Sequence, residues 1–302
     1  VGGKQCIFNL CLAILEAGDE VVIPAPYWVS YTDIVQLTGA KPVIVSCDIN
    51  QNFKITPTQL DQSITNATKL VFLNSPSNPT GAVYSKNELR SLADILLKHP
   101  HVYIGTDDIY EHINLGDNPF YNILMVEPKL KDRVIVLNGV SKAYSMTGWR
   151  IGYAAGPKAI ISAMSKLQSQ STSNPTSISQ VAAEAALRGN KDCIVPMVKA
   201  FKERHAYVLQ ALNDIDGLKC IPAEGAFYAF SDANDAIKNL YESHKISEKN
   251  DLAFAEFLLE SQGVAVVPGS AFGLEGYFRI SFATSMDNLV EAIKRIKIAI
   301  EG

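Results

Sequence analysis

Short apolar runs alternate with amphipathic stretches through the first half of the chain. Runs of strand length occupy residues 21–23, 43–45, 70–73, 102–104 and 134–137. Patterns typical of helices occupy residues 6–15, 28–37, 58–64 and 86–97. Strands that alternate with helices in this way predict an α/β fold, with a mostly parallel sheet covered by helices on both faces.

The pattern changes toward the C-terminus. Residues 162–212 are mainly helical, with an interruption at the Ser- and Thr-rich segment 169–175. Strand patterns then occupy 225–230, 264–267 and 277–281, and helix patterns occupy 252–260 and 286–300. The polar run 242–250 reads as an exposed loop. We therefore expect a large domain over residues 1–210 and a smaller α+β domain over residues 211–302.

Composition narrows the class of protein. The chain has 302 residues and a net charge of −4, which argues against nucleic acid or an anionic membrane as a partner. No apolar run is long enough to span a bilayer. The five cysteines include no Cys-x-x-Cys pair and the five histidines have no metal-ligand spacing, so we expect reduced thiols, a cytoplasmic location and no metal site.

The most informative stretch is residues 138–150, which directly follows the apolar run 134–137. It contains Lys142 and, eight residues later, Arg150, and small or hydroxylated residues such as Ser141 surround both. A lysine amine can form a Schiff base with an aldehyde cofactor, and an arginine can hold a phosphate on that cofactor. Alone, a lysine after a strand is more often a solvated loop residue.

Polar residues also follow two earlier strand patterns. Asp107 comes at the end of one, where ligands bind in open α/β sheets, and a carboxylate there can pair with a protonated pyridine nitrogen. Tyr110 could donate a hydrogen bond to a ring oxygen. Asn78 lies in a Pro- and Gly-rich turn, residues 74–81, and its amide could bond the same oxygen. Alternatively, Asp107 caps a helix and the turn is a simple connector.

These motifs carry a resemblance to a known family. The chain resembles the class I aminotransferases of fold type I, which use pyridoxal 5'-phosphate (PLP), and it is most similar to the bacterial-type aspartate aminotransferase branch. The matching segments are residues 2–5, 24–31, 74–81, 107–111, 138–153 and 278–285. Their order and spacing along nearly the whole chain make the resemblance specific.

The resemblance implies a role for each candidate residue. Lys142 would be the Schiff-base lysine, Asp107 the partner of the pyridine nitrogen, and Arg150 a phosphate ligand. Trp28 would stack on the cofactor ring and Arg279 would grip the substrate α-carboxylate, a bidentate task that suits arginine. Without the resemblance, Trp28 could be a core aromatic and Arg279 a surface ion-pair residue.

The start of the chain also matches the family. Gly3 and Lys4 open a helix pattern, and in the family this turn helps to cradle the PLP phosphate. In the bacterial-type branch the matching lysine reads the distal carboxylate of the substrate, so Lys4 is the candidate for that task. Family members carry a segment before the position of Val1, and we therefore expect the large domain to be incomplete on its N-terminal side.

The expected function is transfer of the amino group of an acidic amino acid, foremost aspartate, to 2-oxoglutarate. Amino acids and 2-oxo acids would be the substrates, and the resemblance implies a homodimer. Prephenate or an aromatic amino acid could be the substrate instead. Two further alternatives are β-elimination on the same scaffold and a catalytically silent PLP-binding regulator.

Overall fold

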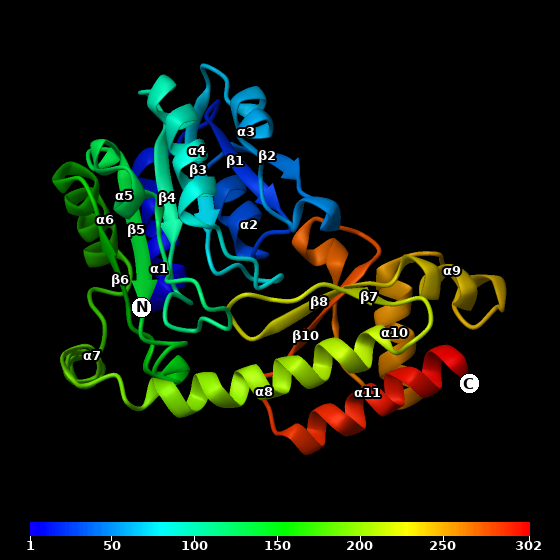
Figure 1. Cartoon of the computed structure of the whole chain (residues 1–302). Coiled ribbons are helices and arrows are strands. Elements are labelled where there is room, and N and C mark those ends of the chain that lie inside the picture. The colour runs from blue at the N-terminus through cyan, green and yellow to red at the C-terminus, as the bar shows by residue number, and fades with distance from the viewer.

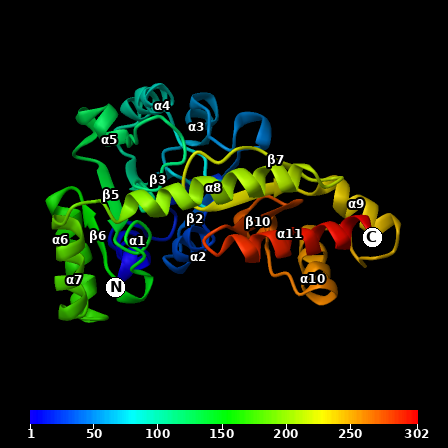
Figure 2. The same ribbon diagram turned by 60° about the horizontal axis from the view of Figure 1, so that its bottom comes forward.

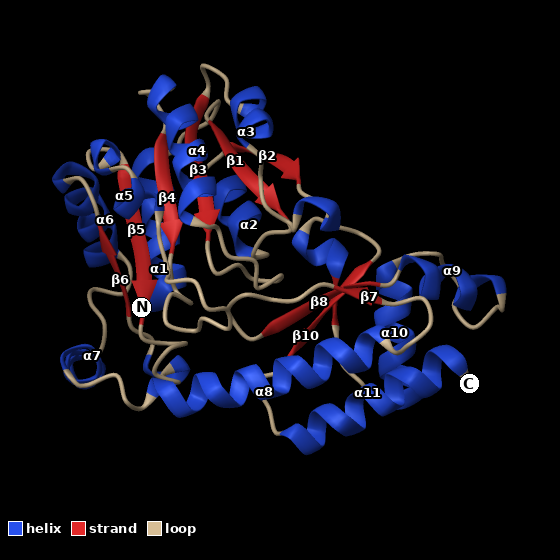
Figure 3. Cartoon of the chain, in the orientation of Figure 1, coloured by secondary structure: helices blue, strands red, loops and turns tan.

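Two sheets organise the chain (Figures 1 and 3). The computed structural model describes residues 1–302. The strands of the larger sheet are β1 (Glu20–Ala25), β2 (Lys41–Ser46), β3 (Thr68–Asn74), β4 (Tyr103–Asp107), β5 (Val134–Gly139) and β6 (Gly152–Ala155). They lie in the order β2-β1-β3-β4-β5-β6, and every pair is parallel except β5 with β6. The predicted mostly parallel sheet is confirmed.

Helices cover both faces of this sheet. On one face lie α1 (Gly2–Ile14), α2 (Ser30–Leu37) and α6 (Lys158–Gln170), and on the other lie α3 (Pro57–Ser63), α4 (Lys86–Lys98) and α5 (Ile123–Val126). Because successive side chains of a strand point to opposite faces, Val21 and Ile23 of β1 pack in the first layer and Val22 packs in the second.

Helix α4 shows how the local sequence sets these layers. Ser85 accepts a hydrogen bond from the Glu88 backbone N–H, and the Glu88 carboxylate accepts one from the Ser85 N–H, which forms a capping box. Leu89, Leu92 and Leu96 then recur at helical spacing and are all buried against the sheet.

The smaller sheet is antiparallel, in the order β7-β8-β10-β9. Its strands are β7 (Lys219–Cys220), β8 (Tyr228–Asp232), β9 (Val267–Pro268) and β10 (Tyr277–Ser281), and it packs with α9 (Asn234–Glu242), α10 (Asp251–Gln262) and α11 (Met286–Glu301). Helix α8 (Ile194–Asn213) runs from the side of α7 (Ser177–Arg188) to this sheet in both ribbon views (Figures 1 and 2). Since α8 passes through residue 210, the division into domains at that point stays a prediction.

Several expected elements differ from the structure. The strand expected at 264–267 shrinks to β9, and the strand expected at 225–230 begins only at Tyr228. Ala226 has a φ of 58° and its N–H donates to the Ile113 carbonyl, so the chain turns there and bonds the loop after β4 instead of extending. The run 242–250 is mostly exposed, although Ile246 is buried in the core under the smaller sheet.

Candidate active site

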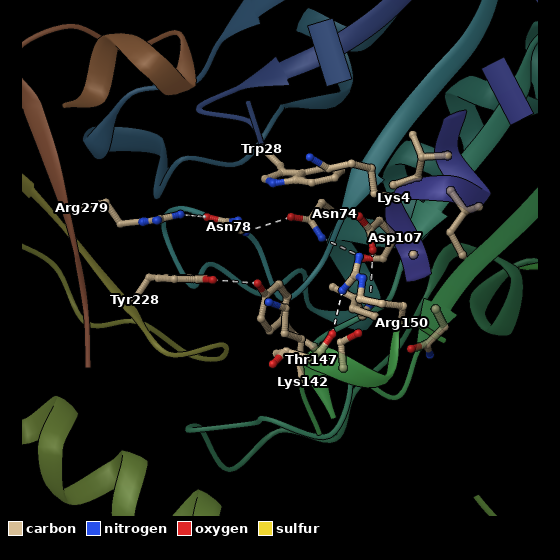
Figure 4. Close-up of a pocket in the computed structure, with 17 residues that line it drawn as sticks. Lys4, Trp28, Asn74, Asn78, Asp107, Lys142, Thr147, Arg150, Tyr228 and Arg279 are labelled. Atoms are coloured by element: carbon tan, nitrogen blue, oxygen red, sulfur yellow. Dashed lines mark hydrogen bonds between the residues drawn. The ribbon is translucent and has the colours of Figure 1, made fainter. Parts of the chain in front are cut away.

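One cavity brings the candidate residues together at the carboxyl ends of β3, β4 and β5 (Figure 4). It has a volume of about 310 Å³ and 17 lining residues. All ten candidates from the sequence line it: Gly3, Lys4, Trp28, Asn78, Asp107, Tyr110, Ser141, Lys142, Arg150 and Arg279. The other lining residues are Ile7, Asn74, Ile109, Leu137, Asn138, Thr147 and Tyr228.

Asp107 is the last residue of β4 and its carboxylate is buried. One oxygen, Oδ2, accepts a hydrogen bond of 2.6 Å from the Tyr31 hydroxyl, and Oδ1 accepts one of 3.3 Å from the Ile109 N–H. Burial raises the pKa of Asp107, whereas these two hydrogen bonds and the positive charge of Lys142 lower it. No helix begins after β4 before residue 123, so Asp107 is not a helix cap.

Lys142 follows β5 and is partly buried. Its Nζ lies 5.9 Å from the centre of the Tyr110 ring and 5.8 Å from that of the Phe227 ring. Burial lowers the pKa of Lys142, the positive charges of Arg150 and Arg279 lower it further, and Asp107 opposes them. A larger fraction of this amine is therefore neutral at a given pH, which a nucleophile and general base requires.

Arg150 and the start of α1 form one end of the cavity. The Arg150 Nη1 donates a hydrogen bond of 2.8 Å to the Thr147 carbonyl. A Cβ added to Gly2 would lie 2.6 Å from the Arg150 Nη2, and Gly2 has a φ of 79°, so only glycine fits here without strain. The free N–H groups of a helix start together with a guanidinium group make a site for an anion.

Arg279 comes from β10 of the smaller sheet and lies away from Arg150 in the cavity (Figure 4). Its Nη1 donates a hydrogen bond of 2.8 Å to Asn78 Oδ1, and its guanidinium carbon lies 4.4 Å from the centre of the Tyr228 ring and 4.9 Å from that of the Phe272 ring. The Arg279 Nε is buried and has no hydrogen-bond partner. The aromatic rings hold the guanidinium group in place while it keeps donors available for a carboxylate.

Asn74 connects two of the candidates. Its Nδ2 donates a hydrogen bond of 2.9 Å to the Asp107 carbonyl, and its Oδ1 accepts one of 2.9 Å from the Asn78 N–H. The Asn78 turn is thereby fixed to the end of β4. Asn74 was not among the candidates from the sequence, although its place directly after an apolar run, like that of Asp107, was a usable signal.

Trp28 and Lys4 form a wall of the cavity (Figure 4). The Lys4 Nζ lies 5.2 Å from the centre of the Trp28 ring, and Trp28 meets Tyr31 edge to face at 5.5 Å. On another wall, the Tyr110 and Tyr228 hydroxyls are 2.9 Å apart and hydrogen-bonded. Tyr228 carried no signal in the sequence, because only the packing of the two sheets brings it to Tyr110.

No group of three or more His, Cys, Asp and Glu side chains is placed to hold a metal ion. None of the helices combines the length and apolar character that crossing a membrane requires.

The chain is similar to proteins of a known family. Residues 1–296 match the family model described as aminotransferase class I and II. The chain is 58% identical over 295 residues to the aspartate/prephenate aminotransferase of Nitrosomonas europaea, covering 98% of this chain and 74% of that protein. It is 52% identical over 298 residues to an aspartate aminotransferase of Rhizobium meliloti, covering 99% and 72%.

Solved structures agree with this comparison. The crystal structure of the Rhizobium meliloti aspartate aminotransferase superposes with a TM-score of 0.94 at 48% identity, covering 99% of this chain and 75% of that one. The Thermus thermophilus aspartate aminotransferase with maleate superposes with a TM-score of 0.90 at 40% identity, covering 99% and 74%. The fold prediction is confirmed, and the chain belongs to the aminotransferase class I and II family.

Proposed function

We propose that this chain is a PLP-dependent aminotransferase that moves the amino group of an acidic amino acid, foremost aspartate, to 2-oxoglutarate. One observation carries the proposal. A partly buried lysine amine, a buried carboxylate and two arginines line the same cavity, and the arginines lie apart from each other. The site can thus receive a phosphate at Arg150 and a carboxylate at Arg279 with Lys142 between them.

The residues present fit PLP. A ligand phosphate suits the Arg150 end, where a Cβ at Gly2 would fill the space next to the guanidinium group. A positively charged ring nitrogen suits the buried Asp107 carboxylate. Among the charged side chains of the protein, only Lys142 lowers the pKa of Asp107, so a second positive charge from the cofactor ring would stabilise the ionised carboxylate. Asn78 and Tyr110 also line the cavity and would face the ring oxygen.

When bound, PLP supplies an aldehyde carbon that joins amines and a ring that withdraws electrons from the substrate Cα. Asp107 would accept a hydrogen bond from the ring nitrogen and keep a proton on it. The backbone of the Asp107 segment is held by Asn74, and its carboxylate is held by Tyr31 and Ile109, so its direction is set before any ligand enters.

Lys142 would provide the nucleophile and then the base. Its lowered pKa leaves a neutral Nζ that can take the proton from the substrate Cα and return it to the cofactor carbon. The rings of Tyr110 and Phe227 lie beside this nitrogen and are part of the surroundings whose burial lowers its pKa. One amine thus serves both tasks.

Substrate recognition would divide between two cations. Arg279 would bind the α-carboxylate that every amino acid carries, through the donors that the structure leaves free. Lys4 would bind the distal carboxylate of an acidic substrate from its place over Trp28. The names of the relatives support aspartate, and several of them also name prephenate, which is therefore the second candidate substrate.

Other activities receive less support. A β-elimination enzyme would use the same lysine and carboxylate, but the compared proteins are named for amino transfer. A catalytically silent regulator has no need of Lys142, Asp107, Arg150 and Arg279 in one cavity, and all four are there.

Lys4→Ala and Arg279→Ala test the substrate assignment. A charge-assisted hydrogen bond is worth about 1.5–3 kcal/mol, or roughly tenfold to a hundredfold in catalytic efficiency. Arg279→Ala should lower kcat/KM for aspartate and phenylalanine alike, whereas Lys4→Ala should lower it for aspartate and prephenate but little for phenylalanine. Lys86→Ala is a matched control, because the Lys86 Nζ lies 5.6 Å from the Tyr121 ring outside the cavity. Equal losses on acidic and neutral substrates in Lys4→Ala would refute the distal-carboxylate role.

We also propose that the working unit is a homodimer joined at α7. Ile178 and Val181 share one face of this helix and are 71% and 68% exposed. The opposite side of α7 packs through Ala183 against Val140 and Ile151, in the segment that carries Lys142 and Arg150. Sedimentation should show a dimer that Val181→Asp weakens, and a fully active monomer would contradict the proposal. Cytoplasmic location stays a prediction.

A further inference from the structure

Tyr31 lies behind the cavity and contacts one of the residues that line it. It does not line the cavity, and it is only 2% exposed. Nevertheless its hydroxyl makes the shortest hydrogen bond to Asp107, at 2.6 Å to Oδ2, across 76 positions of sequence. The buried Tyr31 hydroxyl thus donates its hydrogen bond to a carboxylate that also lines the cavity.

The ring of Tyr31 is also fixed. It stacks on Phe72 of β3 with ring centres 4.7 Å apart and planes 9° apart, and it meets the Trp28 ring edge to face at 5.5 Å. The Tyr31 N–H donates to the Trp28 carbonyl at the start of α2. One side chain therefore contacts both the carboxylate and the aromatic wall of the cavity.

We propose that Tyr31 is a positioning residue that holds the Asp107 carboxylate toward the ring nitrogen of the cofactor. This inference rests on the proposed function, because it needs a ring with a nitrogen in the cavity. Without the hydroxyl, Asp107 would keep only the 3.3 Å hydrogen bond from the Ile109 N–H. A buried carboxylate with fewer donors is more readily protonated and free to turn, so its pairing with the ring nitrogen weakens.

Tyr31→Phe removes the hydroxyl and keeps the stacking on Phe72. The probe is pyridoxamine 5'-phosphate, which has no aldehyde and so reports binding without a covalent link to Lys142. Its dissociation constant, measured by equilibrium dialysis, should rise about tenfold to a hundredfold in the variant. An analogue with C–H in place of the ring nitrogen should bind the variant and the wild type within about twofold, because it has nothing to pair with Asp107.

Tyr84→Phe is the matched control. Tyr84 is another buried tyrosine whose hydroxyl makes a hydrogen bond, accepting from the Ile55 N–H at 2.9 Å, but it does not line the cavity. Tyr84→Phe should leave the affinity of the protein for both probes unchanged. A ¹⁵N label in the ring of pyridoxamine 5'-phosphate gives a second readout, and its chemical shift should move from the protonated toward the neutral position in Tyr31→Phe.

The outcomes separate the two proposals. If the wild type binds pyridoxamine 5'-phosphate and Tyr31→Phe binds it equally well with the same ¹⁵N shift, the Tyr31 inference is wrong and the proposed function stands. Equal weakening of both probes would make Tyr31 a purely structural residue. If the wild type does not bind pyridoxamine 5'-phosphate at all, the proposed function and this inference both fail.

Discussion

Asp108 provides a test of the electrostatics at the end of β4. It is 1% exposed and directly follows Asp107 in the sequence. Its Oδ1 accepts a hydrogen bond from the Thr106 hydroxyl and its Oδ2 accepts one from Asn122 Nδ2, each of 2.6 Å. Burial raises the pKa of Asp108 from 3.8 to about 7, against the two hydrogen bonds, which lower it. The folded protein thus binds this proton more tightly than the unfolded chain does.

The sign and size of the effect follow from this shift. The stability that the protonated carboxyl contributes is fully present below the unfolded pKa and is lost as the pH rises through the folded pKa. Each pH unit between the two values costs about 1.4 kcal/mol, so between pH 5 and pH 8 the wild type loses about 3 kcal/mol from this group. Asp108→Asn avoids the loss, because its amide oxygen can accept from Asn122 and its NH₂ can donate to Thr106.

Urea titrations of the wild type and Asp108→Asn at pH 5 and pH 8 measure this difference. We expect the free energy of unfolding of the variant, relative to the wild type, to rise by about 3 kcal/mol between these pH values. Asp94→Asn, at an exposed position on α4, should show no comparable change. A variant whose relative stability does not change with pH would refute the placement of a buried, proton-binding carboxyl beside Asp107.

Three further results are expected. Asp107→Ala should still bind PLP but transaminate poorly, since nothing then keeps the ring nitrogen protonated, and an unchanged half-reaction rate in stopped-flow absorbance would count against the pair. Gly2→Ala should weaken PLP binding, because its Cβ would lie 2.6 Å from the Arg150 Nη2, and equilibrium dialysis showing unchanged affinity would contradict that crowding. The capture of PLP by cofactor-free protein should accelerate as Lys142 loses its proton, with a midpoint below the ordinary lysine value of 10.5, and a midpoint at or above that value would remove the argument for a lowered pKa.

The sequence predicted most of the first sheet because its strands are short and apolar and its helices are amphipathic. The strand patterns at 70–73 and 134–137 became β3 (Thr68–Asn74) and β5 (Val134–Gly139). The strand pattern at 264–267 was only partly right, since Val267 pairs with Arg279 in β9 whereas Val264 and Val266 pack in the core without strand pairing. Periodicity identifies burial more reliably than it identifies the partner that a backbone will pair with.

The candidate site was predictable where its residues follow strands in sequence. Asp107 and Lys142 share that position, and the structure puts both in the cavity. Tyr31 and Tyr228 were not predictable, because their hydroxyls bond partners 76 and 118 positions away. Such contacts depend on packing between α2 and the sheet, and between the two sheets, which local sequence does not encode. The roles of the lining residues stay predictions until they are measured.

The most direct test of the proposed function is the absorbance and product formation of the purified protein with and without Lys142. The wild type loaded with PLP should show the visible band of a cofactor joined to an amine, and aspartate should abolish that band and release a 2-oxo acid. Lys142→Ala should lack the band and lose at least several orders of magnitude in turnover, because one amine serves as nucleophile and base. Near-normal turnover in Lys142→Ala would contradict the account.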